Sequence, residues 1–265
     1  MKEFETSAGT TTGNTHYLAH KNNQDGYYLI NKDDYIIGVV CDGSSVGMHT
    51  EVGAKLFARA IASKVEVMVK SYDQFNIDLL NLKMKTLISN MIMVVDIDEE
   101  QDFFRDYLAF NVVGFCIAHE RVVIFGIGDR VVYINGKYIN NNKNNEGYFA
   151  AKSIFTGSNG DMMTKIDEFP ANKLKSLLVG SDGVSDLAMR YGSTLPCSKE
   201  MVGHVKQFWT DDKYFNYNEI TKKLNRANMI CCNGGGLETE TGTSRDNGVL
   251  PDDTTMIVVR KKSNL

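Results

Sequence analysis

Acidic residues stand at the ends of three strand-like segments, where their side chains could share a cation. Asp42 follows the apolar run 35–41, Asp182 follows 177–181, and the pair Asp252-Asp253 precedes 255–260. Apolar runs of this length, rich in β-branched residues, are typical of strands that are covered on both faces. A carboxylate at the end of such a strand is held by the sheet while its oxygens reach into a cleft. With no basic neighbours in these segments, the pattern indicates a site for divalent cations.

The types of ligand favour a hard cation. Asp25, which follows the polar loop expected at 13–24, would add a fourth carboxylate. Carboxylates that converge must be neutralised by cations or protons, and oxygen ligands without His or Cys favour Mg²⁺ or Mn²⁺ over Zn²⁺. The glycine after Asp42 and after Asp182 allows a sharp turn and a close approach of its carbonyl to an ion. Asp-Gly is also a common turn dipeptide, and Asp182 could instead cap a helix, so spacing alone leaves structural aspartates as an alternative.

Length and composition are those of an ordinary globular protein. The chain has 265 residues, of which 43% are hydrophobic and 23% charged, so we expect a single domain over 1–265. A net charge of −4 argues against a nucleic-acid partner. The sequence has no apolar run near 18 residues and no signal-peptide core, so no membrane association is expected. Five cysteines without metal-ligand spacing indicate unpaired thiols and a cytoplasmic location.

The elements that must position the acids follow from the hydrophobic periodicity. Helices are predicted from Thr50 to about 68, at 76–95, and near 184–190, 199–209 and 217–229. Strands are predicted at 4–12, 27–31, 35–41, 108–118 and 122–127, with a hairpin at 131–139. Segment 140–145 resembles a surface loop, 234–250 a mobile loop, and 147–170 shows no clear period. Hairpin-connected strands favour an antiparallel α+β layered domain over a doubly wound parallel sheet.

Four sequence blocks, in order, resemble the metal-dependent protein phosphatases of the PPM, or protein phosphatase 2C, type. They are NQDGYY at 23–28, VVCDGSSVG at 39–47 with EVGA at 51–54, FGIGDRVVYINGK at 125–137, and LLVGSDGVSD at 177–186 with DDTTMIVV at 252–259. Thr15-His16, with His16 eight residues before Gln24, is similar to a mostly bacterial, stand-alone variety of this family. The resemblance implies a four-layer α-β-β-α sandwich, with two central antiparallel sheets flanked by helices.

The resemblance also implies a role for each acid at the strand ends. Asp42 would bridge two Mg²⁺ or Mn²⁺ ions, and the carbonyl of Gly43 would bind one of them. Asp182 and Asp252 would hold the first ion, and Asp25 would act on the second, directly or through water. Asp42, Asp182 and Asp252 are therefore the expected catalytic residues.

A third, weaker ion is implied at Asp129 and Asp186, which stand where the family places its ligands. The reaction implied is hydrolysis of phosphoserine or phosphothreonine by a metal-activated water, with no phosphorylated enzyme residue. The expected partner is a phosphorylated protein, the product of a serine/threonine kinase.

Two departures from the family pattern leave other functions open. The family's phosphate-binding arginine falls on His20, and its metal-binding glutamate falls on Gln24. His20 or Lys21 could contact phosphate, although loop side chains of this kind are more often only solvated. A pseudophosphatase that binds phosphoproteins without turnover is therefore an alternative, and a hydrolase of small phosphoesters is a third hypothesis.

Overall fold

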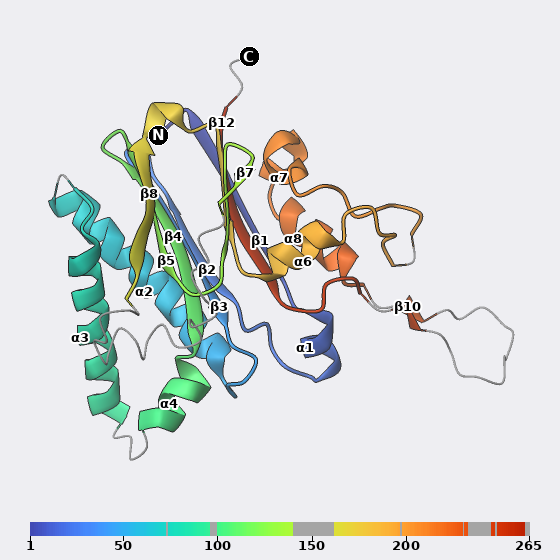
Figure 1. Cartoon of the computed structure of the whole chain (residues 1–265), viewed down its shortest axis with the longest axis horizontal. Coiled ribbons are helices and arrows are strands. Elements are labelled where there is room, and N and C mark those ends of the chain that lie inside the picture. Colours follow the sequence, from blue (N-terminus) through green and yellow to red (C-terminus); the bar gives the residue numbers. More distant parts are fainter. Residues whose placement is uncertain are drawn as a thin grey trace, which may run out of the picture.

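Two five-stranded antiparallel sheets form the centre of the molecule, and helices cover both outer sides (Figure 1). The computed structural model describes residues 1–72, 74–95, 100–139, 162–196, 198–229, 231–232, 245–246 and 248–262. The α+β class and the four-layer arrangement expected from the sequence are confirmed.

In the first sheet, the strand nearest the N-terminus pairs with the strand nearest the C-terminus. In spatial order it consists of β1 (Phe4–Thr11), β12 (Thr254–Lys261), β9 (Ser176–Gly180), β6 (Val131–Ile134) and β7 (Lys137–Tyr138). The second sheet consists of β2 (Gly26–Asn31), β3 (Ile36–Gly43), β4 (Phe110–Ala118), β5 (Arg121–Ile127) and β8 (Thr164–Pro170). A separate short pair is formed by β10 (Cys231–Cys232) and β11 (Arg245–Asp246).

Helices pack on the outer face of each sheet. The second sheet is covered by α2 (Thr50–Ser71), with α3 (Ile77–Val95) and α4 (Glu100–Tyr107) packed on α2. The first sheet is covered by α6 (Gly183–Met189), α7 (Gln207–Thr210) and α8 (Glu219–Ala227), with 3₁₀ turns at Ala171–Lys173 and Asp212–Phe215. The short helix α1 (Asn14–Leu18) lies in the predicted polar loop. None of the helices in the described residues is long and apolar enough to cross a membrane.

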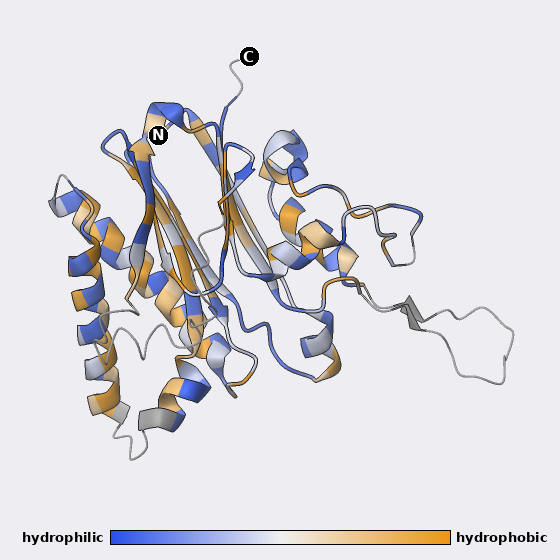
Figure 2. Ribbon diagram, viewed as in Figure 1, coloured by the Kyte–Doolittle hydropathy of each residue, from blue (hydrophilic) through white to orange (hydrophobic). Residues whose placement is uncertain are grey.

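The central strands are buried on both faces, which explains their continuous apolar sequence. In β3, Ile36 and Val40 pack between the sheets, while Ile37 and Val39 pack against the helices, and all four are at most 1% exposed. Figure 2 shows the same pattern, with hydrophobic colour running along the strands and hydrophilic colour on the outer side of α3. Such a strand can hold a side chain at its end in a fixed position.

Several local predictions differ from the structure. The helix predicted at 199–209 is wrong except for its last turn, α7. Gly203 interrupts it, and the Lys206 amide donates to His204 Nδ1 over 3.0 Å, which favours a turn over a helix. The sequence reading also missed α1, α4 and β8. The predicted loop at 140–145 and most of 234–250 lie outside the described residues.

Candidate metal centre

The strand pairing brings the predicted acids to one end of the two sheets. Gly26 pairs with Cys41, so Asp25 before β2 and Asp42 in β3 lie at the same end of the second sheet. In the first sheet, Gly180 at the end of β9 pairs with Met256 near the start of β12, so Asp182 and Asp252 meet in the same way. The Asp182 amide donates to Asp42 Oδ2 over 3.3 Å, which joins the two sheets at this point.

Burial and mutual repulsion both act on these carboxylates. Burial raises the pKa of Asp25 to about 8, helped by the charge of Asp253 and opposed by the hydroxyls of Ser181 and Thr255. Burial and the neighbouring carboxylates, Asp25 first, also raise the pKa of Asp42 well above its usual value. Groups that resist ionisation in this way require protons or cations as partners.

The pKa of Asp182 shows the same repulsion at the open side of the cluster. Partial burial, followed by the charges of Asp252, Asp186 and Asp129, raises it to about 6. Asp182 lies at the N-cap of α6, but its side chain makes no capping hydrogen bond. The structure therefore shows no capping hydrogen bond from this carboxylate, in contrast to the helix-cap alternative.

The donor set fits hard divalent cations. Among the described residues, none of the salt bridges to Lys or Arg involves Asp25, Asp42 or Asp182. Asp25 is 3% exposed, and its Oδ2 has no hydrogen-bond partner. A buried carboxylate oxygen without a partner is costly unless an ion or water binds it. The carboxylates could therefore hold Mg²⁺ or Mn²⁺.

The glycine after Asp42 is required by a close backbone approach. A Cβ at position 43 would overlap the carbonyl oxygen of Gln24, so only glycine allows these two loop segments to meet. The approach brings the main chain after Asp42 next to the main chain before Asp25. This position of Gly43 is consistent with the expectation that its carbonyl oxygen binds an ion.

Asp129 and Asp186 both act on Asp182. Asp129 follows Gly128, whose φ of +79° makes the turn after β5, and its charge raises the pKa of Asp182. Burial and the charge of Asp252 raise the pKa of Asp186 in α6, while Arg190 opposes them. Both acids therefore lie close enough to Asp182 to repel its charge.

Comparison with known proteins identifies the family. The sequence profile of protein phosphatase 2C matches residues 12–216, which is more than half of the chain. This chain belongs to the protein phosphatase 2C family. A search of curated proteins found no match.

Solved structures support the fold of this protein phosphatase 2C family member. A variant of a bacterial serine phosphatase superposes with a TM-score of 0.54 at 13% identity, covering 98% of this chain and 99% of the other. PppA, a regulatory component of T6SS in Pseudomonas aeruginosa, has a TM-score of 0.50 at 12% identity, covering 98% of both chains. A C. elegans sex determining protein has a TM-score of 0.52 at 11% identity, covering 98% of this chain and 65% of the other.

Two residues differ from the family pattern, Gln24 and His20, and Lys21 lies between them. The side chain of Gln24 turns towards the loop after Asp42, where Nε2 donates to the Gly47 carbonyl over 3.4 Å. Lys21 Nζ donates to the Ser45 carbonyl over 2.8 Å in the same loop. His20 is exposed, with a φ of +54°. Gln24 is 2% exposed, and its Oε1 has no hydrogen-bond partner among the described residues.

Sequence reasoning missed the role of Asp253. This carboxylate is 2% exposed, and it accepts hydrogen bonds from the amides of Gly13 over 2.6 Å and Gln24 over 2.5 Å. It also lies 2.9 Å from His16 Nδ1, and this contact raises the pKa of His16. Asp253 thus ties the loop before Asp25 to the start of β12. A second acid directly after Asp252 was the available signal.

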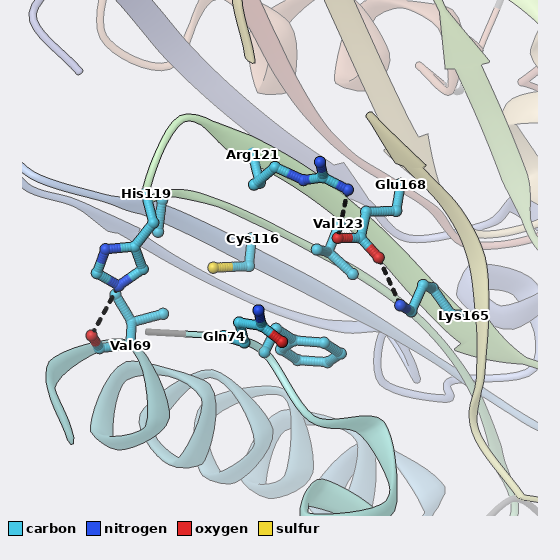
Figure 3. A pocket seen from close by; sticks show the side chains of 10 residues that line it. Val69, Gln74, Cys116, His119, Arg121, Val123, Lys165 and Glu168 are labelled. Atoms are coloured by element: carbon cyan, nitrogen blue, oxygen red, sulfur yellow. Dashed lines mark hydrogen bonds and ion pairs between the residues drawn. The ribbon is translucent and has the colours of Figure 1, made fainter. Parts of the chain in front are cut away.

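A cavity of about 370 Å³ lies at the other end of the second sheet and is not the metal centre. Its wall carries an ion-pair chain, in which Glu168 binds Arg121 at 2.7 Å and Lys165 at 2.5 Å (Figure 3). His119 Nε2 donates to the Val69 carbonyl across the cavity over 3.1 Å. The carboxylate here is already neutralised by two cations, so the cavity offers no cation site comparable to that of the acid cluster.

Proposed function

We propose that this chain is a Mg²⁺- or Mn²⁺-dependent protein serine/threonine phosphatase that hydrolyses phosphoserine and phosphothreonine. The observation that carries the proposal is the meeting of Asp25, Asp42, Asp182 and Asp252 from both sheets, without Lys or Arg to neutralise them. Membership of the protein phosphatase 2C family supports the same reaction.

The proposed ligands divide between the two sheets. Asp42, hydrogen-bonded by the Asp182 amide, would lie between two ions, with the Gly43 carbonyl beside it. Asp182 and Asp252 would complete the first site, and buried Asp25 the second. Asp129 and Asp186, whose charges act on Asp182, would hold the weaker third ion that the family resemblance implies.

The chain's own residues would position the reactants and balance charge. Two divalent ions would supply Lewis acidity and a water acidic enough to attack phosphorus at neutral pH. Hydrolysis would form a bond from a water oxygen to phosphorus and break the bond to the serine or threonine oxygen, which would take its proton from solvent. Lys21, held against Ser45, adds positive charge on the approach of the phosphate, and His20 lies beside it in sequence.

Hydrolysis of p-nitrophenyl phosphate and of a phosphothreonine peptide tests the proposal. With added Mn²⁺, the wild-type chain should hydrolyse both, and Asp42→Ala should reduce the rate by about 100-fold or more. Asp34→Ala is the matched control, because Asp34 is exposed in the turn between β2 and β3, at the opposite end of these strands from Asp25 and Asp42. A wild-type chain inactive with every divalent ion would reject the phosphatase function.

A pseudophosphatase is the second candidate, favoured by Gln24 at the position of the family's glutamate. A neutral amide, whose Nε2 donates to the Gly47 carbonyl over 3.4 Å, would bind the second ion less strongly than a carboxylate. This function predicts that a phosphopeptide binds without being hydrolysed. A hydrolase of small phosphoesters would instead prefer p-nitrophenyl phosphate to the peptide in the same assay.

The proposed substrate is a protein phosphorylated by a serine/threonine kinase, in the cytoplasm. The thiols of Cys41 and Cys116 are free and buried, which is compatible with a reducing compartment. Comparing phosphopeptides with free phosphoserine would test whether the protein part of the substrate contributes to recognition.

A further inference from the structure

His16, Asp252 and Asp253 form a compact group of metal-ligand type at the edge of the acid cluster. One ligand atom from each lies within 4.8 Å of the other two. His16 Nδ1 is 2.9 Å from Asp253 Oδ2 and 3.8 Å from Asp252 Oδ1. Ligand atoms bound about 2.1 Å from one ion lie about 3 to 4.2 Å apart, so small side-chain movements suffice for all three to share an ion.

The imidazole nitrogen is buried and faces two carboxylates. His16 is 5% exposed, and its Nδ1 lies 2.9 Å from the Asp253 carboxylate and 3.8 Å from that of Asp252. Its direction towards two carboxylates is the arrangement of a metal ligand.

The surroundings of the group are also those of a metal site. The Asp253 carboxylate is oriented by the amides of Gly13 and Gln24, at 2.6 and 2.5 Å, as carboxylate ligands commonly are. The side chain of Asp252 is 46% exposed, which leaves a path for an ion from solvent. Two carboxylates and one neutral imidazole together balance a divalent charge.

We propose that His16, Asp252 and Asp253 bind a divalent transition-metal ion, of the class of Mn²⁺, Fe²⁺, Co²⁺ or Zn²⁺, in preference to Mg²⁺. Mg²⁺ prefers oxygen ligands and retains its waters, whereas an imidazole nitrogen suits transition ions. The site shares Asp252 with the proposed phosphatase centre but needs neither Asp42 nor Asp182. Either proposal can therefore fail without the other.

Binding of Co²⁺ to the full chain tests this site, because its visible absorption reports nitrogen ligation. Titrations followed by absorption and calorimetry would compare wild type with His16→Gln, which keeps a polar side chain but removes the imidazole. His204→Gln is the matched control, since His204 is exposed and far from the cluster in the sequence. Asp42→Asn disables the proposed phosphatase centre while retaining all three ligands of this site.

The expected result is a Co²⁺ site that His16→Gln weakens by about tenfold or more and that His204→Gln and Asp42→Asn leave unchanged. Mg²⁺ in excess should not displace the ion. Equal Co²⁺ affinity and an equal spectrum in wild type and His16→Gln would overturn the proposal and leave His16 as an ion-pair partner of Asp253.

A second measurement needs no substitution at His16. Pulsed electron paramagnetic resonance of Mn²⁺ bound to Asp42→Asn should show coupling to a histidine nitrogen. Oxygen ligands alone would overturn the proposal, even if His16→Gln did not fold. A nitrogen signal in a chain without phosphatase activity would support this site while rejecting the proposed function.

Discussion

The Asp182 amide donates to Asp42 Oδ2 over 3.3 Å, and this bond connects the ends of two strands from different sheets. Two acidic residues thus lie in contact between the sheets, where apolar side chains or an ion pair would be more stable. The arrangement costs stability in the absence of cations, because buried like charges repel.

Neutralising Asp42 should therefore stabilise the folded chain while abolishing hydrolysis. Asp42→Asn keeps the acceptor for the Asp182 amide but removes a charge that repels Asp25 and Asp182. In chelator, we expect it to raise the free energy of unfolding by about 1 kcal/mol or more, while hydrolysis is lost. Urea unfolding and a phosphatase assay measure the two effects. Asp34→Asn should change neither, and a destabilised Asp42→Asn would contradict the repulsion.

The stability of the metal-free chain should fall as the pH rises. The folded pKa of Asp182 is about 6 and that of Asp25 about 8, both above the unfolded value near 3.8. The folded state therefore binds more protons than the unfolded state. The free energy of unfolding should fall as the pH rises above about 4, until Asp182 has ionised near pH 6 and Asp25 near pH 8. Urea unfolding at pH 5 to 8 in chelator should show a decrease of more than about 1 kcal/mol. Saturating Mg²⁺ should flatten this slope, and an unchanged slope would argue that no ion binds the acids.

Asp253 should be more important for folding than its half-exposed neighbour Asp252. Asp253→Ala leaves the buried amides of Gly13 and Gln24 without acceptors, so we expect a loss of about 2–4 kcal/mol. Asp253→Asn retains one acceptor oxygen and should lose less. Urea unfolding of both variants gives the order, and equal stability of Asp253→Ala and wild type would show that these hydrogen bonds contribute little.

Packing between α2 and α4 makes Gly53 irreplaceable. A Cβ at this position would overlap the carbonyl oxygen of Tyr107, so Gly53→Ala should destabilise the fold by about 1–3 kcal/mol. Intrinsic helix propensity alone would predict a gain of up to about 1 kcal/mol. Ser63→Ala, also within α2, is the control for propensity. A stabilised Gly53→Ala, measured by thermal unfolding, would mean that α4 moves away easily.

The acids at strand ends were predictable from the sequence because their positions depend on local pattern. The apolar run before Asp42 is long enough to require burial on both faces, and that burial fixes where the strand ends. The same reasoning located Asp182 and Asp252. Once the strands pair in antiparallel register, these ends must meet.

What the sequence could not reveal depends on contacts between distant segments. Gln24 and Gly47 meet only in the folded chain, so the direction of the Gln24 side chain had no local signal. His16 and Asp253 are likewise brought together by the pairing of β1 with β12. The helix predicted at 199–209 failed because the apolar spacing of that segment serves packing against the first sheet in a turn-rich conformation.

The pairing of β1 with β12, from Phe4 with Lys261 to Thr11 with Thr254, has a consequence for biosynthesis. A ribosome that has translated residues 1–250 has already made Asp25, Asp42 and Asp182. The strand that belongs between β1 and β9 has not yet been made. The nascent polypeptide therefore cannot bring the four acids together until β12 emerges from the exit tunnel, and, if the proposed function holds, products of premature termination should be inactive.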